Sequence, residues 1–297
     1  YLAEAVSVVI KTLALRYFQL YLQPAAGCSK TGLYKDIVLR GKKPECVTDL
    51  VPEGFTGSAE DSLFIVQTPA GSVEIAYLAN RNDFERAVQV LAYKCENQII
   101  PQTMGAITIR GIINWRKIEK HQADFKKTCG PFCGWDKEFV RFTADKKNYT
   151  DTLIIISRGG YSGIPASRIG ITEDDWLKDS LKIRMYHECT HFICRALFSE
   201  KIDALWDELL ADCIGLCAAF GSYRNDLAKL FLGIAEDGTY CGGRLENYFP
   251  VGTALDVCAQ NASVLIEKLD TLVKSEAFDA LSDDSLFAMV LRIEKNF

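Results

Sequence analysis

The sequence "MYHECTHFICR", residues 185–195, places two histidines four positions apart, with a glutamate directly after the first. It lies inside the run 173–198, which contains no proline or glycine, so we expect one long helix. Thr172, three residues before an aspartate, is typical of the capping residue at the start of such a helix. With about 3.6 residues per turn, His187 and His191 then project from one face of the helix, one turn apart.

The sequence predicts a second helix directly afterwards, "DALWDELLADCIGLCAAFG" (203–221). Because the connection is only about four residues long, this helix should return antiparallel beside the first. Glu208 and Asp212 are four residues apart and share a face. Ala211 and Gly215 lie on that same face and leave room for close approach. Buried carboxylates that face two histidines need a cation to offset the cost of their desolvation.

The rest of the chain divides into a β-rich part followed by a helical part. The expected elements before the long helix are helices at 1–23 and 82–96, a β-hairpin at 63–78, and β-rich runs at 105–113, 138–143 and 151–157. From Thr172 onward the sequence is almost entirely helical. A sheet followed by helices predicts an α+β protein. We divide it into an N-terminal helix and cap segment (1–60), a core (61–220) and a C-terminal helical part (221–297).

Composition limits the functional classes. The 297 residues are 48% hydrophobic and 25% charged, which is typical of a globular protein. The net charge is −5 and no basic run is present, which argues against nucleic acid as a partner. Lys11 and Arg16 interrupt the apolar N-terminal segment, so we expect a packed helix and no membrane span. Eleven cysteines in a chain this long predict a reduced, intracellular and cytoplasmic protein.

The two histidines also have a simpler interpretation, a core helix with two hydrogen-bonded histidines and a solvated glutamate. A third ligand distinguishes the two, because zinc in hydrolases takes three protein ligands. Cys194 lies roughly 10 Å along the helix axis from His187 at a rise of about 1.5 Å per residue, so we expect it to pack in the core. Glu208 is the better candidate. The helix dipole accounts for Asp203 and Asp207, which stand nearer the start of the second helix.

The motifs "HECTH" (187–191) and "DELLAD" (207–212) resemble those of the zincin metallopeptidases, specifically the gluzincin pattern of thermolysin-like enzymes. The resemblance covers about residues 151–220 and implies a zincin-like fold with an active-site helix pair. It implies the zinc ligands His187, His191 and Glu208, the general base Glu188, and Asp212 as the residue that orients His187. The expected function is therefore a zinc-dependent hydrolase, a metallopeptidase that cleaves peptide or protein substrates with a zinc-bound water.

The resemblance suggests roles for two further parts of the chain. The segment "TLIIISRGGYSGIP" (152–165) would supply a strand at the sheet edge that pairs with an extended substrate. An interior strand followed by a turn explains the same segment equally well. Oxyanion stabilisation would come from a side chain downstream of the ligands, and the candidates are Tyr223, Tyr240, Arg244 and Tyr248.

Two other functional classes compete with this interpretation. A non-catalytic binding or regulatory protein on the same scaffold would hold a structural metal or none, but it would not need Glu188 as a base. The motif "CGPFC", with Cys129 and Cys133, is compatible with a redox or metal site. No second cysteine pair has metal-ligand spacing, so we do not expect that role. His121 is expected to be a surface residue.

Overall fold

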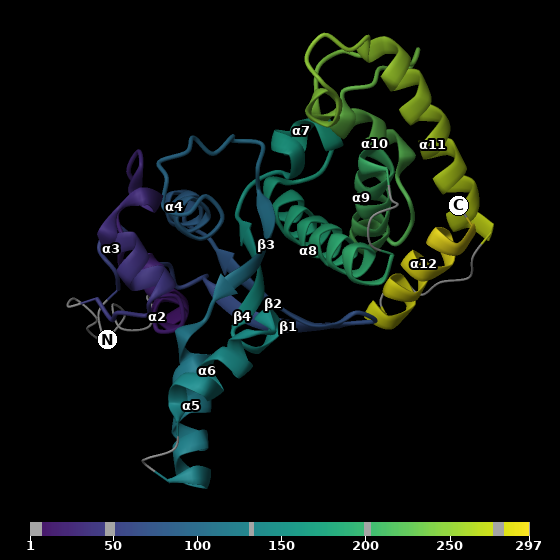
Figure 1. Ribbon diagram of the computed structural model, residues 1–297. Helices are drawn as coiled ribbons and strands as arrows, with labels where there is room; N and C mark the ends of the chain where they lie inside the picture. The colour runs from purple at the N-terminus through teal and green to yellow at the C-terminus, as the bar shows by residue number, and fades with distance from the viewer. Residues whose placement is uncertain (1–7, 45–50, 131–133, 199–202, 276–281, 297) are drawn as a thin grey trace. The chain divides into compact units, whose positions relative to one another are not determined.

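The computed structural model describes residues 8–44, 51–130, 134–198, 203–275 and 282–296. The protein is a mixed α+β structure with a small four-stranded sheet and a mostly helical remainder (Figure 1). It forms two compact units, which we call the sheet unit (1–64, 74–101 and 107–157) and the helical unit (65–73, 102–106 and 158–297). The predicted division at residues 60 and 220 stays a prediction.

The sheet contains the predicted hairpin and two of the three β-rich runs predicted after it, 105–113 and 151–157. The strands are β1 (Ser62–Thr68), β2 (Gly71–Leu78), β3 (Ala106–Ile113) and β4 (Thr150–Ser157), in the order β1-β2-β4-β3. β2 and β4 are parallel, with Ile75 opposite Ile154, so the sheet is mixed. β4 has a neighbouring strand on both sides, and its last five residues are buried. The interior-strand interpretation of this segment is therefore confirmed, and β4 offers no free edge to a substrate.

The longer helices among the described residues that accompany the sheet are α2 (Val8–Ala14), α4 (Arg81–Leu91), α5 (Trp115–Cys129) and α6 (Trp135–Thr143). Shorter helical segments follow α2 at Phe18–Tyr21, Cys28–Lys30, Gly32–Tyr34 and Lys35–Leu39. The helix predicted at 1–23 is thus interrupted after Ala14, and residues 1–7 lie outside the described part. α4 begins at a capping residue, Asn80, whose side chain accepts a hydrogen bond from the Asn82 amide, and it packs against β4. It ends before Lys94 and Cys95, which both have positive φ angles.

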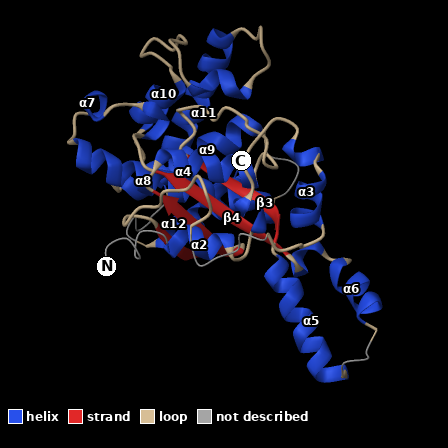
Figure 2. Cartoon of the chain, turned by 90° about the vertical axis from the view of Figure 1, so that its left-hand side faces the viewer, coloured by secondary structure: helices blue, strands red, loops and turns tan. Residues whose placement is uncertain are grey.

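The run 138–143 was predicted as a strand, and this prediction is wrong: it lies in α6. Its aromatic residues recur at helical spacing, and Trp135 contacts Phe139 with ring centroids 5.9 Å apart. Phe142 stacks on His121 of α5 at 4.0 Å. Figure 2 shows α5 and α6 side by side. The aromatic contacts with α5 outweigh the strand propensity of the run, and His121 is partly buried between the two helices.

The helical unit contains α7 (Ala166–Ile169), α8 (Glu173–Leu197), α9 (Ala204–Phe220), α10 (Asn225–Leu232), α11 (Leu255–Ser275) and α12 (Asp283–Asn296). α8 starts as predicted, with the Thr172 side chain accepting a hydrogen bond from the Asp175 amide. α9 packs against α8, α10, α11 and α12 (Figure 1), which explains why it is apolar around most of its circumference. None of the helices in the described ranges has the length and apolar character that crossing a membrane requires.

α8 and α9 approach each other closely at Gly215. A Cβ atom at this position would lie 2.8 Å from the Ile183 carbonyl oxygen and 3.0 Å from its Cγ2 atom. The close approach predicted at Gly215 is therefore confirmed. It matters for function because it brings the carboxylates of α9 within reach of the histidines of α8.

Gly215→Ala is expected to lower the free energy of unfolding by about 1–3 kcal/mol, because the backbone of α8 would have to move away. Alanine has the higher helix propensity, so any loss of stability must come from the helix contact. Urea denaturation of the metal-free protein measures the effect. Gly32→Ala is the matched control, since no atom lies within 4 Å of a Cβ there. If Gly215→Ala were as stable as the wild type, the close contact would be contradicted.

Candidate metal centre

α8 and α9 bring His187, His191 and Glu208 together, and one ligand atom of each lies within 4.8 Å of the others. The Nε2 atoms of the two histidines are 3.0 Å apart. The Glu208 carboxylate oxygens lie 3.5 Å from His187 Nε2 and 3.4 Å from His191 Nε2. In a tetrahedral zinc site with bonds of about 2.0–2.1 Å, neighbouring ligand atoms are separated by about 3.3 Å. This buried group could therefore bind a metal ion.

The other ring nitrogen of each histidine is held by a carboxylate. His187 Nδ1 lies 2.9 Å from Asp212 Oδ1, and His191 Nδ1 lies 2.8 Å from Asp207 Oδ2. A carboxylate accepts hydrogen bonds, so each Nδ1 carries a hydrogen and each Nε2 of a neutral ring has a free lone pair. Two lone pairs and the Glu208 carboxylate that face one another repel unless a proton or a metal ion lies between them. Metal-binding histidines usually have their other ring nitrogen held by a carboxylate or another acceptor, so this arrangement is compatible with a bound metal ion.

The charges around the cluster determine the protonation of its members. Burial lowers the pKa of His191, but hydrogen bonds with Asp207 and Glu208 outweigh burial and raise the pKa to about 10. Burial raises the pKa of Glu208, but the hydrogen bond with His191 and the nearby charge of His187 hold that pKa well below its usual range. Both shifts mean that the three residues favour a positive charge between them, either a proton or a metal ion.

Asp212 is buried at 1% exposure and is held by several donors. Its Oδ1 atom accepts a hydrogen bond from the Tyr161 hydroxyl at 2.6 Å, and its Oδ2 atom accepts one from Arg244. Burial by itself raises the pKa of Asp212. The charge of Arg244 and the hydrogen bond with His187 together have the larger effect, so the pKa lies below its usual value. The carboxylate is therefore charged in the interior because Arg244 compensates its charge.

Two residues at this cluster were missed in the sequence. Asp207 was attributed to the helix dipole, yet it holds His191 as described above. The antiparallel arrangement of α8 and α9 identifies it. The residue that pairs with His191 must lie about one turn earlier in α9 than Asp212, which pairs with His187. Tyr161 was considered only as part of a strand end, yet its hydroxyl lies 3.0 Å from His187 Nδ1.

The predicted base and the oxyanion candidates occupy different places. Glu188 lies in α8 beside His187 with 8% exposure, and its role stays a prediction. Of the four candidates, Arg244 reaches Asp212, and Tyr248 donates a hydrogen bond to Glu208 Oε2 at 3.0 Å. Tyr240 instead donates to the Gly243 carbonyl oxygen. The buried Tyr223 hydroxyl has no hydrogen-bond partner among the described residues. The structure therefore places Arg244 and Tyr248 at the cluster.

The cysteines considered in the sequence are not among the candidate metal ligands. Cys194 is fully buried in α8, so the prediction of a packing role is confirmed. Cys129 is exposed at the end of α5, and Cys133 lies outside the described residues.

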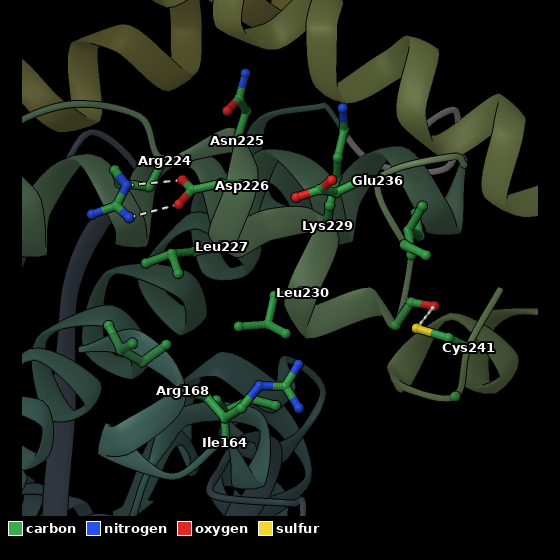
Figure 3. Close-up of a pocket in the computed structure, with 15 residues that line it drawn as sticks. Ile164, Arg168, Arg224, Asn225, Asp226, Leu227, Lys229, Leu230, Glu236 and Cys241 are labelled. Atoms are coloured by element: carbon green, nitrogen blue, oxygen red, sulfur yellow. Dashed lines mark hydrogen bonds and ion pairs between the residues drawn. The ribbon is translucent and has the colours of Figure 1, made fainter. Parts of the chain in front are cut away.

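A cavity of about 710 Å³ lies elsewhere in the helical unit and is lined in part by α10 (Figure 3). Leu227 and Leu230 contribute apolar surface, and Arg224 and Asp226 form an ion pair across one side. None of the three candidate metal ligands lines it. Two of its lining residues, Ile164 and Gly242, lie three residues after Tyr161 and two before Arg244. Two of the chain segments that border the cavity therefore also supply side chains to the cluster.

Asp207→Ala and Asp212→Ala are each expected to weaken metal binding roughly 10- to 100-fold, because each frees one histidine ring to rotate and lowers its basicity. Competition with a chromophoric chelator measures the affinity. Asp226→Ala removes a carboxylate on α10 that forms an ion pair with Arg224 and contacts none of the candidate metal ligands among the interactions described, and it serves as the control. Unchanged affinity in both variants would contradict the assignment of these carboxylates as partners of metal-binding histidines.

Comparison with other proteins identifies a family for the chain and no role for the cluster. No curated protein and no solved structure is significantly similar to it. A family model matches residues 1–284, nearly the full length of the chain, and its description gives no activity. By this match the chain belongs to the family of unknown function DUF7005.

Proposed function

We propose that the protein is a zinc-dependent hydrolase, specifically a metallopeptidase of gluzincin type, with His187, His191 and Glu208 as zinc ligands. One observation supports it above the others. The two histidine Nε2 atoms lie 3.0 Å apart, with the Glu208 carboxylate 3.4–3.5 Å from both, while a carboxylate holds each Nδ1 atom. A core helix with two hydrogen-bonded histidines does not require a third carboxylate close to both Nε2 atoms.

Zinc at this position would polarise a carbonyl group and lower the pKa of a water molecule. Residues of the chain would transfer the proton and stabilise the developing charge. Glu188, on the flank of the histidine face of α8, would take the proton from the water and pass it to the leaving amine. Arg244 presents N–H donors beside the cluster that would stabilise negative charge on the carbonyl oxygen, and the Tyr248 hydroxyl would do so by exchanging its hydrogen bond with Glu208 for one with that oxygen.

Metal content and cleavage test the proposal directly. We expect about one zinc ion per chain by elemental analysis of the purified protein, and cleavage of a peptide library that stops when a chelator is added. Mass spectrometry identifies the products. If zinc is bound and no peptide is cleaved, the non-catalytic binding or regulatory alternative is favoured. If the protein retains no metal after loading with zinc, the proposal is wrong.

A further inference from the structure

Tyr161 lies in a tight turn, residues 159–164, which directly precedes the short helix α7. Three residues of the turn have positive φ angles, and one of them, Ser162, is not a glycine. Such a backbone conformation persists only where surrounding contacts hold it. The turn therefore needs an anchor, and α8 provides one.

One stripe of α8 carries both the anchors of the turn and the candidate metal ligands. Trp176, Ser180, Arg184, His187 and His191 all fall within about 80° of one another around the helix axis at 3.6 residues per turn. The first three hold the turn. Trp176 Nε1 donates to the Ile164 carbonyl oxygen at 2.7 Å, the Ser180 hydroxyl accepts from the Tyr161 amide at 2.9 Å, and Arg184 donates to the carbonyl oxygens of Gly159 and Gly160.

The turn also leaves no room for a side chain at Gly160, where it meets α8. A Cβ atom at Gly160 would lie 2.4 Å from the Ile164 carbonyl oxygen and 2.8 Å from Trp176 Nε1. Glycine is therefore required here for the turn to close against α8. The result is a rigid support whose position is set by the same helix that carries the two histidines.

The support places the Tyr161 hydroxyl between three groups. It donates to Asp212 Oδ1 at 2.6 Å, it lies 3.0 Å from His187 Nδ1, and it accepts from Arg244 Nη1 at 3.3 Å. The ring is buried against Phe231, with ring centroids 5.0 Å apart. Because the hydroxyl touches both members of the Asp212–His187 pair, it restricts rotation of the imidazole as well as movement of the carboxylate.

We infer that Tyr161 is a positioning residue of the metal centre, held by the α8-anchored turn so that its hydroxyl fixes the Asp212–His187 pair and aims His187 Nε2 at the metal. The inference rests on the proposed metal centre. It differs from simple core packing because it depends on the hydroxyl and not on the ring. Tyr161→Phe keeps the ring contacts and removes only the oxygen.

Tyr161→Phe is expected to weaken zinc binding roughly 10-fold in competition with a chromophoric chelator. The visible absorption spectrum of the cobalt-loaded variant should also differ from that of the wild type, since it reports ligand geometry. Tyr17→Phe is the matched control. The buried Tyr17 hydroxyl donates to Asp151 at 2.8 Å in the sheet unit, so this variant loses a hydrogen bond of the same kind. It should lose thermal stability and keep wild-type metal affinity and spectrum.

His191→Ala distinguishes a wrong role for Tyr161 from a wrong assignment of the metal centre. If it has lost zinc while Tyr161→Phe keeps wild-type affinity and spectrum, the role of Tyr161 is wrong and the metal centre stands. If His191→Ala retains zinc, the metal centre itself is wrong and the inference fails with it. Should Tyr161→Phe not fold, Ser180→Ala loosens the turn and keeps the hydroxyl. A smaller loss of affinity in Ser180→Ala then supports the inference, and unchanged affinity contradicts it.

Discussion

Replacing Glu188 by glutamine is expected to reduce peptide hydrolysis roughly 10²- to 10⁴-fold, which is the usual contribution of a general base. Glutamine has nearly the same size and shape, so the buried position in α8 stays filled, and none of the three proposed metal ligands is replaced. It lacks the carboxylate that accepts a proton. Initial rates on a peptide identified in the library screen, together with elemental analysis of both proteins, measure the effect.

The control for this variant is Glu294→Gln. Glu294 is a partly buried carboxylate on α12 that accepts a hydrogen bond from Trp206 Nε1 at 2.8 Å, and glutamine can still accept it. We expect wild-type rates from this variant. If Glu188→Gln cleaves as fast as the wild type, another group takes the proton and the proposed mechanism is incorrect. If it loses zinc along with activity, Glu188 acts on the metal site and not as a base.

His191→Ala is expected to lower the zinc content from about one ion per chain to near zero, because only His187 and Glu208 would remain of the three ligands. Zinc that binds only the folded protein raises its thermal stability, so added zinc should stabilise the wild type and not the variant. Elemental analysis and thermal denaturation with and without zinc measure the two effects.

The remaining histidine provides the control. His121→Ala removes a partly buried ring that stacks on Phe142 between α5 and α6, so it tests the general effect of losing a histidine. We expect this variant to keep the zinc content and the zinc-dependent stabilisation of the wild type. Equal zinc in His191→Ala and the wild type would show that the ion, if present, is bound elsewhere.

Local signals in the sequence predicted most of the elements. The capping residue Thr172, the uninterrupted run after it and the hairpin at 63–78 each depend on neighbours within a few residues, and all are found in the structure. The run 138–143 was wrong because its β-branched and aromatic residues suit a strand or a helix equally well. Its contacts with α5 decided the outcome, and such contacts join residues distant in the sequence.

The sequence by itself determined which donors could meet. Spacing of four residues places His187 and His191 on one face of a helix, and a short connection returns Glu208 and Asp212 to the same face. Only the tertiary structure decided which group meets which nitrogen. Asp207 reaches His191, while Tyr161 and Arg244 converge on Asp212 from segments 51 and 32 residues away. Helical periodicity is a local property of the backbone and can be read from residue spacing. The packing of a distant turn depends instead on contacts between side chains far apart in the sequence, which no local pattern predicts.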